Sequence, residues 1–106
     1  MKSVVDMIPY AISVACDTDS SATFNLSFEI RAMDDTSNIS DIETSNTTVR
    51  GNASISGLDT SVSKMSLFTS SSKILTNQSW GLYLSSASSS STSMSEMVTK
   101  VFFYQA

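Results

Sequence analysis

Strict alternation of apolar and polar side chains over residues 23–33 is the sequence feature that most constrains the fold. One parity holds only apolar residues, Phe24, Leu26, Phe28, Ile30 and Ala32, and the other parity is mainly polar. Because successive side chains of a β-strand point to opposite faces of its sheet, a period of two is typical of a half-buried strand. The pattern therefore predicts a strand with one face in the core.

The N-terminal segment shows the same period. Ile8, Tyr10, Ile12, Val14 and Cys16 stand in phase, and the polar residues 17–21 follow them. Two alternating runs separated by turn-forming residues are typical of a β-hairpin. We therefore expect the N-terminal strand to pair with the strand at residues 23–33.

Two later segments add strands of different character. Residues 47–57 alternate with small residues on the apolar parity, among them Gly51 and Ala53, which predicts a close approach by another element. Residues 96–106 are apolar on both parities. A strand of that kind is buried on two sides or paired in an assembly.

Serine and threonine make helices a poor alternative. The chain of 106 residues contains 25 Ser and 11 Thr, whose hydroxyl groups compete with the hydrogen bonds of a helical backbone. We predict an all-β protein: one antiparallel β-sandwich domain over residues 1–106, of immunoglobulin-like or jelly-roll size, with about seven short strands. The acidic stretch at residues 34–46 and the low-complexity stretch at residues 85–95 are expected to form exposed loops.

Charge and composition exclude several classes of function. Six Lys and Arg residues are spread singly in a chain of net charge −4, so no nucleic-acid partner is expected. No apolar run reaches the roughly 18 residues of a spanning helix, so no membrane span is expected. The chain has no His, which removes Ser-His-Asp and Cys-His catalysis, and no serine lies in a G-x-S-x-G motif. We expect a protein that is not an enzyme and has no cofactor.

A metal site is also not expected. Asp17 and Asp19 have the spacing that begins a helix-loop-helix calcium motif, but Ala22 and Phe28 stand where that motif needs Gly and Glu. A looser calcium site that uses Asp34 and its neighbour Asp35 is the alternative to a solvated turn.

All five Asn residues open an N-x-S/T triplet without proline, the acceptor pattern for N-glycosylation. With about a third of positions Ser or Thr, chance alone would place all five so with a probability of only ~0.4%. The pattern predicts exposure outside the cell, at a cell or virion surface, with glycan attachment at Asn25, Asn38, Asn46, Asn52 and Asn77. The compositional alternative is that turn-forming Asn stands beside Ser and Thr without modification.

The function expected from these features is that of a structural subunit which binds copies of itself, in a fibre, pilus or virion. The N-terminal segment, through Ile8, Tyr10, Ile12 and Val14, is the candidate for self-association, as a strand donated to the next copy or as the first strand of its own sheet. The alternative is an adhesin or lectin-like module that binds surface glycans with Trp80 and Tyr83, since aromatic faces suit sugar rings.

Overall fold

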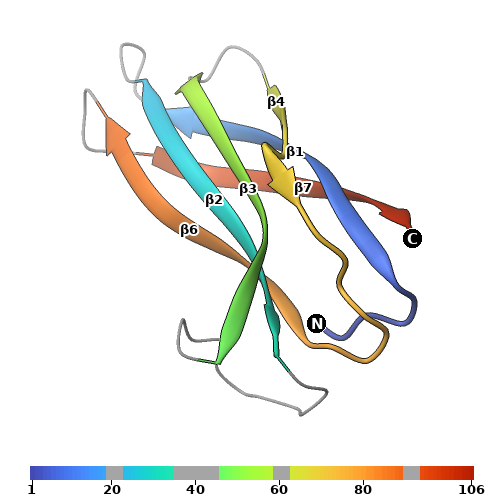
Figure 1. Ribbon diagram of the computed structural model, residues 1–106. Helices are drawn as coiled ribbons and strands as arrows, with labels where there is room; N and C mark the ends of the chain where they lie inside the picture. The colour runs from blue at the N-terminus through green and yellow to red at the C-terminus, as the bar shows by residue number, and fades with distance from the viewer. Residues whose placement is uncertain (19–22, 35–45, 59–62, 90–93) are drawn as a thin grey trace.

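The computed structural model describes residues 1–18, 23–34, 46–58, 63–89 and 94–106, and these residues form seven β-strands (Figure 1). The strands are β1 (Met7–Thr18), β2 (Phe24–Met33), β3 (Thr47–Leu58), β4 (Lys64–Leu67), β5 (Ser70–Ser71), β6 (Trp80–Ser89) and β7 (Met94–Gln105).

The strands build two antiparallel sheets, with strand order β4-β1-β7 in one and β5-β3-β2-β6 in the other. The arrangement is that of a small β-sandwich, which confirms the predicted all-β fold and its number of strands. Each sheet ends in a short strand on one side, β4 or β5, and in a long strand on the other, β7 or β6.

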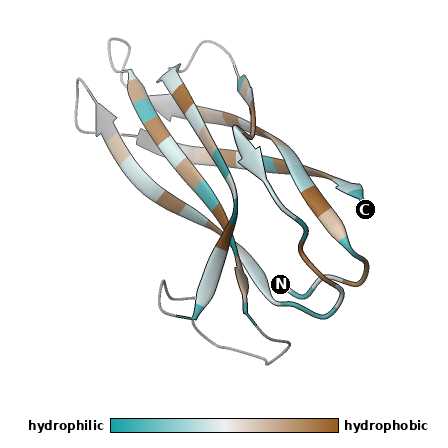
Figure 2. Cartoon of the chain, viewed as in Figure 1, coloured by the Kyte–Doolittle hydropathy of each residue, from teal (hydrophilic) through white to brown (hydrophobic). Residues whose placement is uncertain are grey.

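Strand β2 is the central element of the core, as its alternation predicts. The banding of its hydropathy is visible in Figure 2. Phe28 and Ile30 are at most 2% exposed, and Leu26 is 3% exposed. Phe28 and Leu26 belong to a cluster that is completed from the other sheet by the fully buried Ile12 and Val14. Ile30 packs in a second cluster with Ala32 and Ile74. Apolar contact of β1 with β2 and β3 therefore joins the two sheets.

The predicted hairpin between the first two strands is wrong. Strand β1 pairs with β4 and β7, and β2 pairs with β3 and β6, so the chain crosses from one sheet to the other after β1. The physical reason is that β1 and β2 each carry a complete apolar face. Two such faces bury more apolar surface when they pack against each other in two layers than when they lie side by side.

A β-bulge at Tyr10 interrupts the predicted phase of β1. Pro9 lies opposite Phe103 and Ala11 lies opposite Phe102, so Tyr10 is an extra residue on β1. An extra residue reverses the parity of the residues that follow it. Pro9 and Ile12 therefore both point into the core, although strict alternation places them on opposite faces.

The predicted close approach at Gly51 is confirmed. A Cβ atom at this position of β3 would lie 3.0 Å from Cδ1 of Phe68 and 3.2 Å from Cγ of Pro9. A side chain here would require Phe68 or Pro9 to shift by a few tenths of an ångström, so the lack of a Cβ atom favours the close packing of β3 against the opposite sheet.

The loop predicted at residues 85–95 is wrong at both of its ends, because β6 continues to Ser89 and β7 begins at Met94. Pairs such as Leu26 with Ala87 and Asn25 with Ser88 extend β6 along the whole of β2. The ladder depends on backbone groups, which serine supplies as well as other residues do. Residues 90–93 lie outside the described part of the chain. So do residues 35–45 of the other predicted loop, at whose ends the Asp34 N–H donates to the Asn46 carbonyl at 3.2 Å.

Asp6 ties the start of β1 to the segment before β6. The backbone N–H and the hydroxyl of Thr76 donate to Asp6 Oδ1 at 2.8 and 2.9 Å. These bonds, the backbone bond first, lower the pKa of Asp6 below its ordinary value of 3.8, and the positive charge of Lys73 adds to them. A lowered pKa means that the folded state favours the ionised form.

We expect Asp6→Asn to lower the melting temperature slightly at neutral pH, because the charge that strengthens both hydrogen bonds is lost. In the wild type this stabilisation is complete above pH 3.8 and disappears as the pH falls through the lowered pKa of folded Asp6. The melting temperatures of the two proteins should therefore converge in acid. Thermal unfolding from pH 7 to pH 2 measures this, and a difference that stays constant over the range would contradict the assignment.

Candidate functional site

The outer face of the β4-β1-β7 sheet is apolar, and we call it the outer apolar face. In an antiparallel pair, residues that lie directly opposite each other share a face. The register places Leu67, Ala11 and Phe102 in one row across the three strands, and Met65 opposite Ser13 in the next row. The other apolar pairs on this face are Ile8 with Tyr104 and Ala15 with Val98.

Three aromatic rings form the centre of the outer apolar face. The Tyr10 ring centroid lies 6.2 Å from that of Phe102 and 5.9 Å from that of Tyr104, both in tilted geometry. The bulge at Tyr10 makes this cluster, because it turns Tyr10 and Ala11 to the same side of the sheet. Side chains with few rotatable bonds lose little entropy when they become buried in an interface, so this centre is suited to contact.

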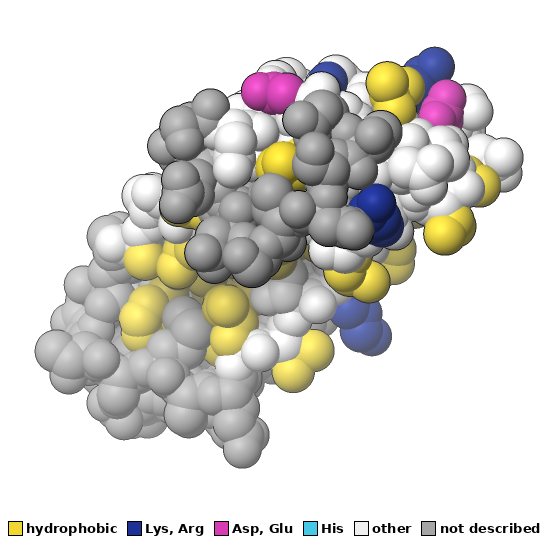
Figure 3. Space-filling view, turned by 90° about the horizontal axis from the view of Figure 1, so that it is seen from below, with side chains coloured by type: hydrophobic (Ala, Val, Ile, Leu, Met, Phe, Trp, Pro, Cys, Tyr) yellow, Lys and Arg dark blue, Asp and Glu magenta, His cyan; other side chains and the backbone are white. Residues whose placement is uncertain are grey.

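The larger side chains of the outer apolar face are open to solvent within the described structure, whereas Ala11 at its centre is 1% exposed. Leu67 is 68% exposed, Met65 64%, Val98 57% and Tyr104 50%. Among the described side chains that the register places on it, Lys100 is the charged one. Space-filling Figure 3, seen from below, shows hydrophobic side chains reaching the surface and charged side chains that are few and scattered.

The outer face of the other sheet is polar. Ser27 lies opposite Ser54 and Glu29 opposite Asn52, and Arg31 forms an ion pair with Glu29 at 3.1 Å. Contiguous apolar surface on one sheet beside an ordinary polar surface on the other is typical of a site that contacts another macromolecule.

The four residues predicted for self-association divide between two environments. Ile8 and Tyr10 belong to the outer apolar face. Ile12 and Val14 are fully buried in the core of the chain's own sandwich, where β1 lies between β4 and β7. Within one chain, β1 is thus the middle strand of its sheet. Its exchange between copies stays a prediction.

Sequence reasoning missed Met65 and Leu67, because the four residues of β4 are too short a run to show a period. The apolar character of both parities in residues 96–106 does indicate the contribution of Val98, Phe102 and Tyr104. What the pattern could not show is which neighbouring strands would complete the face.

Two of the predicted glycan-attachment residues lie on strands of the β5-β3-β2-β6 sheet. Asn25 is exposed on β2, and its Oδ1 accepts a hydrogen bond from the Gly57 N–H at 3.0 Å. Asn52 is half-buried on β3, and its Nδ2 donates to Ser70 Oγ at 3.3 Å.

The other predicted attachment residues lie in connections. Asn77 is exposed in the turn before β6 and has a φ of 70°, a left-handed conformation that Asn adopts more readily than most residues. Asn46 is half-buried directly before β3, and Asn38 lies outside the described residues. Glycan attachment at these positions stays a prediction.

Trp80 and Tyr83 do not form the joint platform expected for sugar binding. The Trp80 ring packs against Phe103 at 5.0 Å between centroids, on the core side of β6. Tyr83 lies opposite Glu29 on the outer side, where the Arg31 guanidinium stands 5.8 Å from its ring centroid. A spacing of three residues places the two rings on opposite faces of a strand.

The described residues also bear on the other candidate chemistry. They contain no pocket and no group of three or more His, Cys, Asp or Glu side chains that could hold a metal ion. Asp34, one of the two candidate calcium ligands, accepts a hydrogen bond from the Thr48 hydroxyl, and Asp35 lies outside the described part. In the same part of the chain no helix is long and apolar enough to cross a membrane.

Comparison with known proteins finds no protein family, no curated protein and no solved structure that matches this chain.

Proposed function

We propose that this protein is a non-enzymatic structural subunit that assembles with copies of itself at a cell or particle surface, as part of a fibre, pilus or virion. The observation that carries the proposal is the outer apolar face, where Met65, Leu67, Val98 and Tyr104 are each at least 50% exposed. Apolar surface of this kind is stabilised when it is removed from water, at about 25 cal/mol per Å².

A second copy is the partner that the outer apolar face favours. The net charge of −4 repels another copy at long range as it repels anionic lipid, so the attraction comes from the apolar surface. Between Ile8 and Ser13 the face has Lys100 as its charged residue, so two copies can meet over this part without placing acidic groups against each other. A face that binds its own equivalent about a two-fold axis is the commonest way in which identical chains associate.

We expect Leu67→Lys to weaken self-association at least tenfold, because a charge replaces a side chain that is 68% exposed in the monomer and buried in the proposed contact. Sedimentation velocity over a wide range of concentration measures the effect. The matched control is Ser56→Lys, which adds the same charge at an exposed position of β3 in the other sheet. A wild-type protein that stays monomeric at every concentration, or equal effects of the two substitutions, would contradict the proposal.

Electron microscopy of the protein at its source tests the proposed setting, because it distinguishes a polymer or shell from a free domain. Intact mass tests the proposed exposure outside the cell. Added whole sugars at Asn25 or Asn77 would support it, and a mass equal to that of the sequence would remove glycosylation from the proposal.

A further inference from the structure

The outer edge of β6 is a long strand edge without the usual protection. Natural sheets guard their edges with short strands, charges, proline or bulges. Here β4 has four residues, β5 has two, and β7 carries Lys100 together with two register shifts against β1. Strand β6 has ten residues, Trp80–Ser89, and none of them is charged or proline. Its one register shift against β2 has Ser85 as the extra residue, so the stretch from Trp80 to Leu84 is regular.

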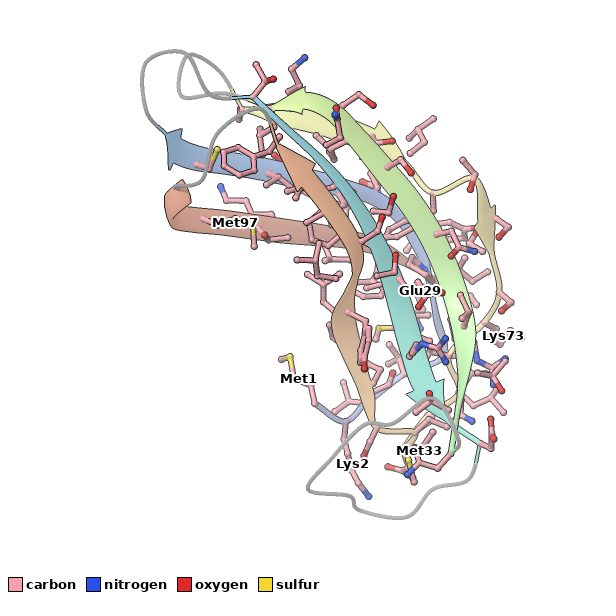
Figure 4. All side chains as sticks on the ribbon, turned by 90° about the vertical axis from the view of Figure 1, so that its left-hand side faces the viewer. Met1, Lys2, Glu29, Met33, Lys73 and Met97 are labelled. Carbon is pink, nitrogen blue, oxygen red and sulfur yellow. The ribbon has the colours of Figure 1, made fainter. Side chains whose placement is uncertain are left out.

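The beginning of this edge already accepts an extended segment. The Trp80 N–H donates to the Met1 carbonyl at 2.7 Å, and the Met1 ammonium donates to the Trp80 carbonyl at 2.9 Å. One step along, the Ser3 N–H donates to the Gln78 carbonyl at 3.0 Å. Figure 4 shows Met1 beside the start of β6. The edge is therefore accessible and competent to form an antiparallel ladder.

Beyond Trp80 the same edge has no strand beside it in the described structure. Backbone groups of alternate residues point to the same side of a strand. The N–H and C=O groups of Leu82 and Leu84 therefore point away from β2, as those of Trp80 do. The hydrogen-bonded strand neighbour of β6 is β2 on the other side. Residues 82–87 are all exposed.

The side chains at this edge are also incompletely covered. Leu82 lies opposite Ile30 and Leu84 opposite Phe28, so both leucines are on the core side of their sheet. Ile30 and Phe28 are at most 2% exposed, whereas Leu82 is 37% and Leu84 46% exposed. A strand added along β6 would place its own side chains beside the two leucines and reduce that exposure.

We propose that β6 of one copy pairs antiparallel with β6 of a second copy, over the stretch after Trp80, so that two four-stranded sheets become one of eight strands. This inference rests on the proposed function. A second copy is favoured because the edge has no charge with which to select a foreign peptide. Moreover, copies already held together elsewhere present this edge at a high effective concentration.

A second interface also answers a question of size. With strands about 4.8 Å apart and a rise of about 3.3 Å per residue, the outer apolar face has a planar area of roughly 400 Å². A standard stable interface buries about 800 Å² per partner. One two-fold contact closes at a dimer, whereas two different two-fold contacts whose axes do not intersect generate an open chain. Strand pairing at β6 thus supplies the second contact, and the additional buried area, that a polymer needs besides the outer apolar face.

The test combines two substitutions at the edge with the control Ser56→Lys, which lies on β3 of the same sheet and is separated from the β6 edge by β2. Leu84→Lys adds a charge to the edge, and Leu82→Pro removes an outward N–H that the isolated chain does not use in its ladder. We expect both variants to stop at dimers while the wild type and Ser56→Lys form longer species in sedimentation velocity. Adding Leu67→Lys to Leu84→Lys should leave monomers. Circular dichroism checks the fold, and if one edge variant fails to fold, the other decides.

Hydrogen exchange gives a direct readout of the pairing. The amides of Leu82 and Leu84 should exchange fast in the dilute monomer and at least tenfold more slowly in the assembled protein. Tyr83, whose amide points toward β2, should change little. If the edge variants polymerise like the wild type and these amides stay unprotected, the β6 inference is wrong although the proposed function stands. If the wild type does not associate at all, both are wrong. Assembly that appears only with an added foreign protein would also overturn pairing between copies.

Discussion

Phe28→Ala is expected to destabilise the fold by about 3–5 kcal/mol, the usual range when a buried aromatic ring is removed from a core. Phe28 is 2% exposed in the middle of β2, and its cluster draws Ile12 and Val14 from the opposite sheet and Ile55 from β3. Removing the ring leaves a cavity at the place where the two layers meet. Neighbours fixed in strands cannot collapse fully to fill that cavity.

Urea unfolding followed by circular dichroism measures the loss. Domains of this size have total stabilities of about 5–15 kcal/mol, so a large share of the stability would disappear and the variant would be partly unfolded near body temperature. Phe28→Leu is the matched control, because it keeps most of the volume and should cost less than half as much. Equal losses for Ala and Leu would mean that the ring does not bridge the two sheets.

The fold class was predictable because the pattern of β2 is local and unambiguous. Every apolar residue of one parity, from Phe24 to Ala32, is buried. The alternation is uninterrupted because β2 itself has no extra residue where it pairs with β3 and β6. A period of two needs no knowledge of the neighbours. It follows from the backbone alone, and this is why the strand and its buried face could be read correctly.

The partners of each strand were not predictable in the same way. The expected hairpin of β1 and β2 relied on a short polar connection, but the choice between pairing and stacking depends on the burial of both apolar faces at once. The bulge at Tyr10 also lies outside any local pattern, because the register with Phe102 and Phe103 decides it. One inserted residue then moved Tyr10 away from Ile12 to the opposite face of the sheet.

About half of the candidate site was accessible from the sequence. The apolar C-terminal residues indicate a second contact surface, and Tyr10 was among the residues predicted for self-association. Their combination with Leu67 of β4 was not accessible, since the middle strand of a sheet brings together residues far apart in the chain. The unprotected edge of β6 was hidden for another reason. Its serine-rich second half has the composition of a loop, although its backbone completes a ladder with β2.

Removing residues 1–16 is expected to abolish folding, the largest effect of all these changes. The deletion takes away most of the middle strand of the β4-β1-β7 sheet, and β4 and β7 then have no strand between them. It also removes Ile12 and Val14, which are fully buried against β2. The β4-β1-β7 sheet would be lost, and the apolar face of the β5-β3-β2-β6 sheet would be exposed to water. Circular dichroism and the dispersion of NMR signals measure the loss.

Adding the missing segment as a separate peptide turns this deletion into a test of strand exchange between copies. If a synthetic peptide of residues 3–16 restores the fold of the truncated chain, β1 can bind in trans, as it must when one copy donates it to the next. The matched control is the same peptide with Ile12→Ser and Val14→Ser, which keeps the backbone ladder but removes the two buried side chains. Rescue by the natural peptide alone would support the exchange. Failure of both peptides would restrict β1 to its own sandwich, so that assembly would depend on the outer apolar face and on β6, where each contact leaves the core of every copy intact.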